Sequence, residues 1–376
     1  MFEQDVHFLE QHTDVVVLSR GLAEVAVCPE MQGRVMTSTA GGPNGLSYGW
    51  INRDFIASGE NNLHMNPFGG EDRVWLGPEG GQFSLFFKNG DPFDLDHWFT
   101  PGALNEDVYP VIEQSRERVV FEKDMILKNY SDTEFRIRLN REVLLLDISS
   151  VTGDLGVNID PAVQTVAYES VNTITNTGEV DWTRETGLVS VWILGMFNPS
   201  PATTVVLPFV PGPEAELGPI VNDAYFGKVP EDRLVIREDV LFFRCDGEYR
   251  SKIGLSATRC RPIMGSWDAE NGVLTLVSYT RPEGAMEYVN SMWELQEEPF
   301  AGDVVNSYND GPPAPGEKPM GPFYELESSS PAAALAPGES LSHVHRTIHL
   351  KGAREALDAV ARKALGVSID EIEKVF

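Results

Sequence analysis

The segment between residues 52 and 81 gathers polar and aromatic side chains of the kinds that bind sugars. Its candidate ligand contacts are His64, Asn66, Glu71, Asp72, Arg73 and Trp75. Carboxylates and amides accept hydrogen bonds from sugar hydroxyls, arginine donates them, and an indole ring can stack on the C–H face of a pyranose. A surface turn with Arg73 paired to a neighbouring carboxylate would use the same residues, so the composition leaves both interpretations open.

A candidate general base lies in the segment Gly321–Ser328. On a β-strand, Glu325 and Glu327 project from one face, and the residues between them project from the other. A carboxylate that faces a wet hollow can act as a general base when its neighbours adjust its pKa. Paired glutamates are also ordinary on a solvent-facing strand, and residue type alone favours that simpler explanation.

Lys252 stands beside an apolar strand pattern within Arg250–Gly254. It could donate a hydrogen bond to a hydroxyl or serve as a cationic acid, although a lone lysine is more often solvated. A second long polar loop, over residues 308–322, contributes Asn309 and Asp310 as candidate substrate contacts, since binding residues concentrate in such loops.

Three histidines alternate along one predicted strand, at His343, His345 and His349. The first two could share a metal ion, but a third ligand is not apparent nearby, and a polar outer face would explain the pattern equally well. We therefore expect no metal and no cofactor. A metal-assisted sugar lyase or isomerase built on this strand remains a third alternative for the function.

The overall composition limits the possible partners. With 57 acidic and 29 basic residues the net charge is −28, which would repel nucleic acid but leave a neutral sugar unaffected. The three cysteines are too few and too widely spaced for a disulfide framework. No apolar run is long enough to cross a bilayer, and no secretory signal opens the chain. We expect a cytoplasmic protein if Met1 is the natural start, and a periplasmic one if a leader has been removed.

The elements that must position these residues are predicted to be almost all β-strands. Short runs of alternating apolar and polar residues recur along the chain, separated by Gly, Pro, Asn and Asp. They are too many for one flat sheet, which favours a large antiparallel β-sandwich. Asn271-Gly272 predicts a tight hairpin in which both residues take positive φ.

The tail after residue 350 has helical apolar spacing instead. Ser368 and Glu371 fit a capping box, in which each side chain satisfies a free backbone amide of the first helical turn. We predict a sandwich domain over residues 1–350 and a short C-terminal helical cap over 351–376 that packs on it.

Four segments form a recognisable set: Val27–Ser38 with Arg34, Asn62-Leu-His64 before Gly69-Gly70, Val171–Gly178 and Gly321–Ser328. Together they resemble the galactose-mutarotase-like superfamily of aldose-1-epimerase-like proteins, in one of its uncharacterised bacterial branches. The resemblance spans most of residues 15–350 and implies an all-β supersandwich fold. In that superfamily a late-strand glutamate takes the anomeric proton while a histidine protonates the ring oxygen.

The resemblance implies a role for three residues of this chain. Glu325 matches the catalytic base, His64 the histidine that contacts substrate, and Arg34 the early arginine. The sequence departs from the superfamily pattern because it has no histidine between His97 and His343, where the catalytic histidine would stand. The acid would then be His64, Lys252 or a residue that the sequence pattern does not identify.

We therefore expect a carbohydrate-active protein, an epimerase or mutarotase-like enzyme that acts at or near the anomeric carbon of a small sugar. The alternative is a carbohydrate-binding or regulatory module that kept the cleft and lost the chemistry. The predicted catalytic residues are Glu325, His64 and Lys252. The predicted binding residues are Arg34, Asn66, Glu71, Asp72, Arg73, Trp75, Asn309 and Asp310.

Overall fold

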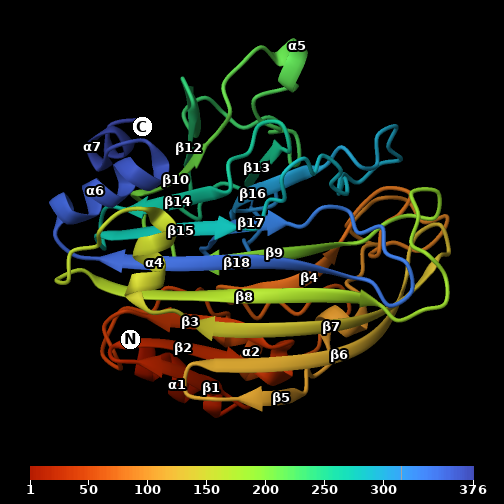
Figure 1. The fold of residues 1–376 in the computed structure, drawn as a ribbon, viewed down its shortest axis with the longest axis horizontal. Coiled ribbons are helices and arrows are strands. Elements are labelled where there is room, and N and C mark those ends of the chain that lie inside the picture. Colours follow the sequence, from red (N-terminus) through yellow and green to blue (C-terminus); the bar gives the residue numbers. More distant parts are fainter. Residues whose placement is uncertain (315) are drawn as a thin grey trace.

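The computed structural model describes residues 1–314 and 316–376, so the predicted 308–322 loop is described except at residue 315. Within these residues the strands form three antiparallel sheets, of ten, five and three strands. The predicted β-sandwich is confirmed. The long strands of the ten-stranded sheet cross the view in Figure 1, with strands of the five-stranded sheet fainter behind them.

The ten-stranded sheet has the spatial order β11 (Leu234–Arg237), β12 (Val240–Arg244), β10 (Thr203–Pro208), β14 (Ile263–Asp268), β15 (Val273–Tyr279), β18 (Ser340–Lys351), β8 (Gln164–Asn176), β7 (Glu134–Leu145), β6 (Arg118–Lys128) and β5 (Val111–Gln114). The five-stranded sheet has the order β13 (Ser251–Ser256), β16 (Asp303–Asn309), β17 (Tyr324–Ser329), β9 (Ser190–Phe197) and β4 (Arg73–Gly77). The smallest sheet joins β1 (Val16–Arg20), β2 (Ala23–Cys28) and β3 (Arg34–Thr39).

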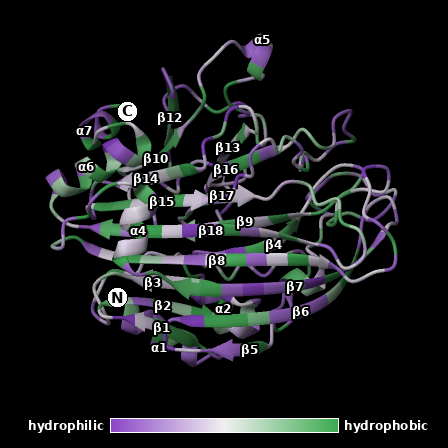
Figure 2. Cartoon of the chain, in the orientation of Figure 1, coloured by the Kyte–Doolittle hydropathy of each residue, from purple (hydrophilic) through white to green (hydrophobic). Residues whose placement is uncertain are grey.

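In the outer strands of the ten-stranded sheet, buried and exposed residues alternate, as the sequence pattern predicts. Along β7, Phe135 and Ile137 are buried, whereas Glu134 and Arg136, which alternate with them, are exposed. Figure 2 shows the same alternation of hydrophobic and hydrophilic residues along β6 and β7. One face of this sheet therefore packs on the core while the other meets solvent.

The five-stranded sheet is buried on both faces. Every residue of β9 is buried, because one face packs on the ten-stranded sheet and loops cover the other. Val74 of β4 and Ile193 of β9 belong to the same apolar cluster as Ile137 of β7. The residues that alternate with them point away from the ten-stranded sheet. This second face carries the cavity described below.

The helices are short. They are α1 (Phe2–Glu10), α2 (Arg53–Ser58), α3 (Gly102–Asn105), α4 (Ile148–Leu155), α5 (Glu214–Leu217), α6 (Arg354–Leu365) and α7 (Ile369–Glu373), with a 3₁₀ turn at Pro29–Met31. Among the described residues, no helix has the length and apolarity that a membrane span needs.

The C-terminal helices pack on the ten-stranded sheet, beside the C-terminus in Figure 1. Leu357 and Val360 of α6 share an apolar cluster with Trp267 and Leu274 of the sheet. The predicted capping box is confirmed: Ser368 Oγ accepts from the Glu371 amide, and the Glu371 carboxylate accepts from the Ser368 amide.

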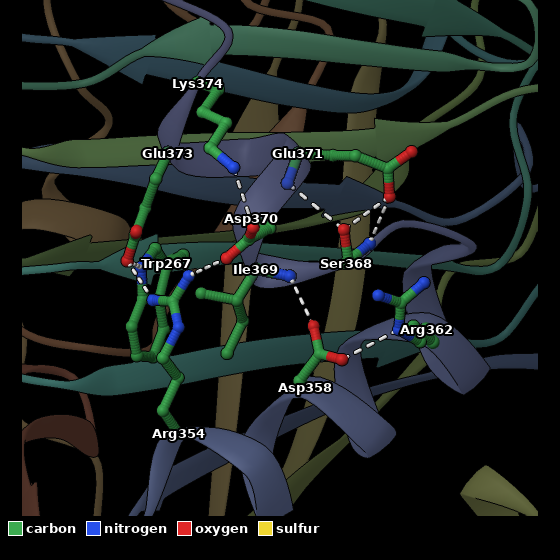
Figure 3. A network of polar contacts seen from close by, with 10 residues as sticks. All are labelled: Trp267, Arg354, Asp358, Arg362, Ser368, Ile369, Asp370, Glu371, Glu373 and Lys374. Carbon is green, nitrogen blue, oxygen red and sulfur yellow. Dashed lines mark hydrogen bonds and ion pairs between the residues drawn. The ribbon is translucent and has the colours of Figure 1, made fainter.

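Ion pairs tie α6 to α7 around this cap. Figure 3 shows Arg354 of α6 reaching Asp370 and Glu373 of α7, and Glu373 also accepts from Trp267 Nε1 of the sheet at 2.9 Å. The second helix is therefore held both to the first helix and to the sheet.

The hairpin between β14 and β15 differs in detail from its prediction. Asp268 pairs with Val273, so the loop holds four residues instead of two, and Gly272 has φ 62° while Asn271 keeps a negative φ. The tight-turn prediction is wrong because the Asp268 carboxylate accepts hydrogen bonds from the backbone of Glu270 and Asn271. These bonds stabilise the longer loop.

Candidate functional site

A cavity of about 500 Å³ opens on the face of the five-stranded sheet that points away from the ten-stranded sheet. The strand register brings its floor together from distant parts of the chain. Lys252 of β13 lies opposite Tyr308 of β16, Tyr308 opposite Glu325 of β17, and Glu325 opposite Met196 of β9. Neighbouring strands lie about 4.8 Å apart, so these four side chains form one row across the sheet.

The next row of the sheet supplies the charges that surround Glu325. Glu327 lies opposite Leu194, and Leu194 lies opposite Arg73 of β4. Arg73 Nη2 stands 3.4 Å from Glu325 Oε1, and Lys252 Nζ donates to Glu327 Oε2 at 2.9 Å. All of these charged groups are buried or nearly so. The floor is therefore a compact set of two cations and two carboxylates shielded from bulk water.

The surroundings of Glu325 weaken its acidity. Its pKa is raised to about 8, because burial and then the negative charge of Glu327 raise it more than Arg73 and Lys252 lower it. Burial lowers the pKa of Lys252, but the charges of Glu327 and Glu79 outweigh that effect and the net shift is upward. Lys252 therefore keeps its positive charge at neutral pH, whereas Glu325 gains and loses its proton at a pH close to neutral.

A third carboxylate, Glu79, enters the cavity from the loop after β4. The Glu79 amide donates to Ser291 Oγ at 3.1 Å, and the next residue, Gly80, lies so close to the Met292 carbonyl that a Cβ would stand 2.3 Å from it. Glycine is therefore needed for this close approach of two loops. Burial raises the pKa of Glu79 to about 7, against the attraction of Lys252.

Aromatic side chains form much of the cavity wall. Its tryptophans are Trp75, Trp98, Trp192 and Trp293. The Arg73 guanidinium lies 4.0 Å from the centre of the Trp75 ring, and Lys252 Nζ lies 5.0 Å from that of Trp192. Trp192 Nε1 also donates to Glu327 Oε2 at 2.9 Å, which fixes its ring. Flat apolar faces next to charged hydrogen-bonding groups are the combination that pyranose rings require.

Four of the residues predicted from the sequence line this cavity: Arg73, Trp75, Lys252 and Glu325. His64 does not. Its Nδ1 lies 2.6 Å from the Trp98 carbonyl oxygen, and its ring stacks on Phe99 with centroids 4.4 Å apart. These contacts hold the imidazole behind the wall, although the next residue, Met65, does reach the cavity.

Arg34 and Asn66 serve the loops around the site and do not line the cavity. Arg34 is buried and donates to the Gly69 carbonyl at 2.7 Å. The Asn66 side chain accepts from the Asn62 amide at 2.7 Å and donates to the Asn105 carbonyl at 3.1 Å. Both side chains satisfy backbone groups of the 52–81 segment, which explains their polarity without a ligand.

Glu71 and Asp72 are buried between the sheets. Glu71 accepts from the Ser38 hydroxyl at 2.8 Å and from Tyr168 OH at 3.1 Å. Asp72 pairs with Arg141 at 2.7 Å, where both side chains are fully buried. Asp72 directly precedes Arg73, and because side chains alternate along a strand, it points away from the cavity that Arg73 enters.

Asn309 and Asp310 support the loops at the other edge of the cavity. Asn309 accepts from the Gly247 amide at 2.8 Å and donates to the Tyr249 carbonyl at 2.9 Å. Asp310 accepts from Tyr308 OH at 3.0 Å and from the Gly321 amide at 2.9 Å. Asp310 therefore positions Tyr308, which does line the cavity.

The histidine strand is β18, and its histidines face the interior instead of forming a polar outer face. His343 Nε2 and His345 Nδ1 each lie 2.8 Å from Ser328 Oγ, and His349 Nε2 lies 3.2 Å from Glu71. Within residues 1–314 and 316–376, no cluster of three or more Asp, Glu, His or Cys side chains has a geometry that could hold a metal ion.

Glu79 and most of the aromatic wall were not predicted from the sequence. Glu79 stands in Gly77-Pro-Glu-Gly-Gly81, where the density of glycines signalled a loop but gave no direction for its side chain. Glu327 was noticed only as the neighbour of Glu325. Its position two residues along the same strand could have marked it as a member of the site.

Comparison with solved structures shows a mutarotase-like fold. A putative aldose 1-epimerase from Escherichia coli K12 is similar over 90% of this chain and 99% of its own, with a TM-score of 0.53 and 12% identity. The Slr1438 protein from Synechocystis sp. covers 90% of this chain and 96% of its own, with a TM-score of 0.52 and 12% identity. A galactose mutarotase-like protein from Lactobacillus casei covers 90% and 100%, with a TM-score of 0.50 and 11% identity.

These likenesses confirm the predicted resemblance at the level of the fold. Identities this low do not carry an activity from one protein to another. No curated protein matches the sequence. One family model matches residues 1–376, and its description is that of a family of unknown function, DUF6786. The chain therefore belongs to the family of unknown function DUF6786.

Proposed function

We propose that the protein binds an aldose in the cavity of the five-stranded sheet and interconverts its anomers, as an aldose-1-epimerase-like isomerase. The observation that carries this proposal is Glu325, a buried carboxyl on the cavity floor whose pKa is raised to about 8 between two cations. A proton-exchanging group in a cavity lined by tryptophans fits a sugar and fits proton transfer on it.

The reaction needs one base and one acid. Glu325, in its ionised form, takes the proton of the anomeric hydroxyl. As the C1–O1 bond gains double-bond character, the bond between C1 and the ring oxygen breaks, and the ring oxygen takes a proton from the acid. Rotation about the C1–C2 bond followed by the reverse transfers gives the other anomer. Both protons are returned, so no co-reactant is consumed.

We assign the acid to Glu79 instead of His64, because Glu79 lines the cavity and His64 does not. An acid works best when its pKa lies near the working pH, and the pKa of Glu79 is raised to about 7. Lys252 has a raised pKa and stays protonated, so its role is to stabilise the negative charge that develops on the sugar oxygens.

The direct test is anomer exchange measured by NMR for a panel of aldoses. Wild type is expected to exchange the anomers of at least one aldose faster than buffer. Glu325→Gln, which keeps the shape of the side chain but cannot accept the proton, should slow that exchange by about 10²–10⁴-fold. Exchange that is unchanged in Glu325→Gln would refute the assignment of the base.

A carbohydrate-binding module without catalysis is the second candidate. The position of His64 favours it, because one ring nitrogen lies against the Trp98 carbonyl oxygen and the ring stacks on Phe99. Saturation-transfer NMR separates the two functions. Sugar contacts in the wild type without any acceleration of exchange would support the module, whereas no contact with any aldose or uronate would remove both.

A further inference from the structure

The cavity has a second zone that the proposed reaction does not use. The groups around Glu325 are buried, but three large apolar side chains at the rim are exposed: Leu95 by 58%, Phe226 by 45% and Met320 by 43%. A single exposed apolar side chain is ordinary. These three come from different loops, before α3, before β11 and before β17, and they meet at the mouth of one cavity.

A polar group stands within this apolar rim. The Arg250 guanidinium lies 4.0 Å from the centre of the Phe226 ring and also lines the cavity. Arg250 also donates toward the Tyr308 hydroxyl of the cavity wall. A guanidinium carries five N–H donors, so donors remain for a ligand that reaches the rim.

The size of the cavity also favours a ligand larger than one sugar ring. Pockets for drug-sized molecules span about 300–1,000 Å³, so a cavity of about 500 Å³ holds more than a single pyranose ring. Phe226 lies edge to face with Tyr308, with ring centroids 5.8 Å apart, and Tyr308 pairs with Glu325 across the sheet. The rim zone at Phe226 therefore lies one side chain beyond the row that holds Glu325.

We propose that this rim is a second sugar subsite, and that the ligand is a disaccharide whose reducing ring lies at Glu325 and whose second ring lies at Phe226. A pyranose presents an apolar C–H face and a circle of hydroxyls. The Phe226 ring can stack on the apolar face, and the Arg250 guanidinium can donate hydrogen bonds to the hydroxyls. This inference rests on the proposed function, since it takes the position of the first ring from it.

Isothermal titration calorimetry with monosaccharides and disaccharides tests the subsite. Glucose and galactose are compared with maltose, cellobiose and lactose, which keep a free anomeric carbon. Wild type should bind at least one disaccharide about tenfold more tightly than its reducing-end monosaccharide. Phe226→Ala should abolish that advantage and leave the monosaccharide affinity unchanged. Leu295→Ala is the matched control, because Leu295 is 68% exposed and does not line the cavity.

The outcomes separate this inference from the proposed function. Monosaccharide binding with no gain for any disaccharide, or an equal loss of both affinities in Phe226→Ala, would overturn the second subsite alone. A 4-nitrophenyl glycoside that binds more tightly than every disaccharide, and that depends on Phe226, would also overturn it in favour of an apolar substituent. Disaccharide binding without anomer exchange would instead retain the subsite and remove the enzyme.

Discussion

Glu325 lies among groups that move its pKa in opposite directions. Burial and the charge of Glu327 raise it, while Arg73 and Lys252 lower it, and the result is about 8. Glu79 has a raised pKa of about 7 for the same main reason, burial. A base and an acid whose pKa values both lie close to neutral pH can exchange roles when the reaction runs in reverse.

These values predict a bell-shaped pH dependence of anomer exchange. The rate needs Glu325 ionised and Glu79 protonated, so it should be greatest between about pH 7 and 8 and fall about tenfold per pH unit on either side. Glu79→Gln should lower the rate and remove the fall on the alkaline side. An alkaline limb that survives in Glu79→Gln would show that another group is the acid.

Glu327 is predicted to act on the reaction without touching the sugar. It accepts hydrogen bonds from Lys252 and Trp192, and its charge raises the pKa of both Glu325 and Glu79. Glu327→Gln removes the charge and keeps an oxygen acceptor, so both pKa values should fall.

The whole pH–rate profile of Glu327→Gln should therefore move toward lower pH. Glu283→Gln, at an exposed loop position, serves as the control and should leave the profile in place. A profile of Glu327→Gln that loses height without moving would mean that Glu327 only supports the structure.

At the scale of the elements, strand register determines which residues meet. Lys252, Tyr308 and Glu325 come from three strands and form one row because their backbones pair directly. The sequence predicted the strands and the shared face of Glu325 and Glu327, since both follow from two-residue alternation. Arg73 and Trp75 were predicted instead as part of a long polar loop, whereas the structure places both on β4.

The loops around the cavity could not be predicted with the same success. Arg34, Asn66, Asn309 and Asp310 have the residue types of a binding site, yet their hydrogen bonds go to backbone groups of neighbouring loops. Composition does not distinguish a side chain that hydrogen-bonds to the backbone of a neighbouring loop from one that hydrogen-bonds to a ligand. That distinction depends on contacts between segments far apart in the sequence.

The C-terminal cap offers a prediction at this scale. Ser368→Ala removes one half of the capping box of α7 and should lower the free energy of unfolding by about 1 kcal/mol. Ser368→Thr keeps a hydroxyl acceptor and should retain most of that stability. Urea unfolding of the three proteins decides the point, and an equal loss in both variants would assign the effect to packing instead of capping.

At the scale of the whole molecule, the chain is strongly acidic but its cavity balances charges of both signs. The net charge is −28, yet three cations (Arg73, Arg250 and Lys252) line the cavity beside three glutamates (Glu79, Glu294 and Glu325). Two sheets packed face to face bury the other side of the five-stranded sheet, which keeps the cavity floor rigid. Charged groups that are held in place stabilise the charge that develops on a substrate in the transition state, because they do not have to reorient during the reaction.

The buried carboxyl on that floor should cost the folded protein stability at high pH. The pKa of Glu325 rises from 4.5 to about 8 on folding, so its favourable contribution is complete below pH 4.5 and is lost as the pH rises through 8. Glu325→Gln cannot ionise and should be more stable than wild type above pH 8, by on the order of a few kcal/mol, and equal to it near pH 4. Thermal unfolding across this pH range measures the difference, and a gap that does not change with pH would contradict the raised pKa.

The position of a bound sugar tests the central claim most directly. A crystal structure of the Glu325→Gln protein soaked with an aldose that the wild type binds should show the pyranose in the cavity of the five-stranded sheet. Its anomeric hydroxyl should lie within hydrogen-bond distance of the residue 325 side chain, and its ring face should lie against a tryptophan. A sugar bound elsewhere, or one that turns its anomeric carbon away from residue 325, would contradict the account.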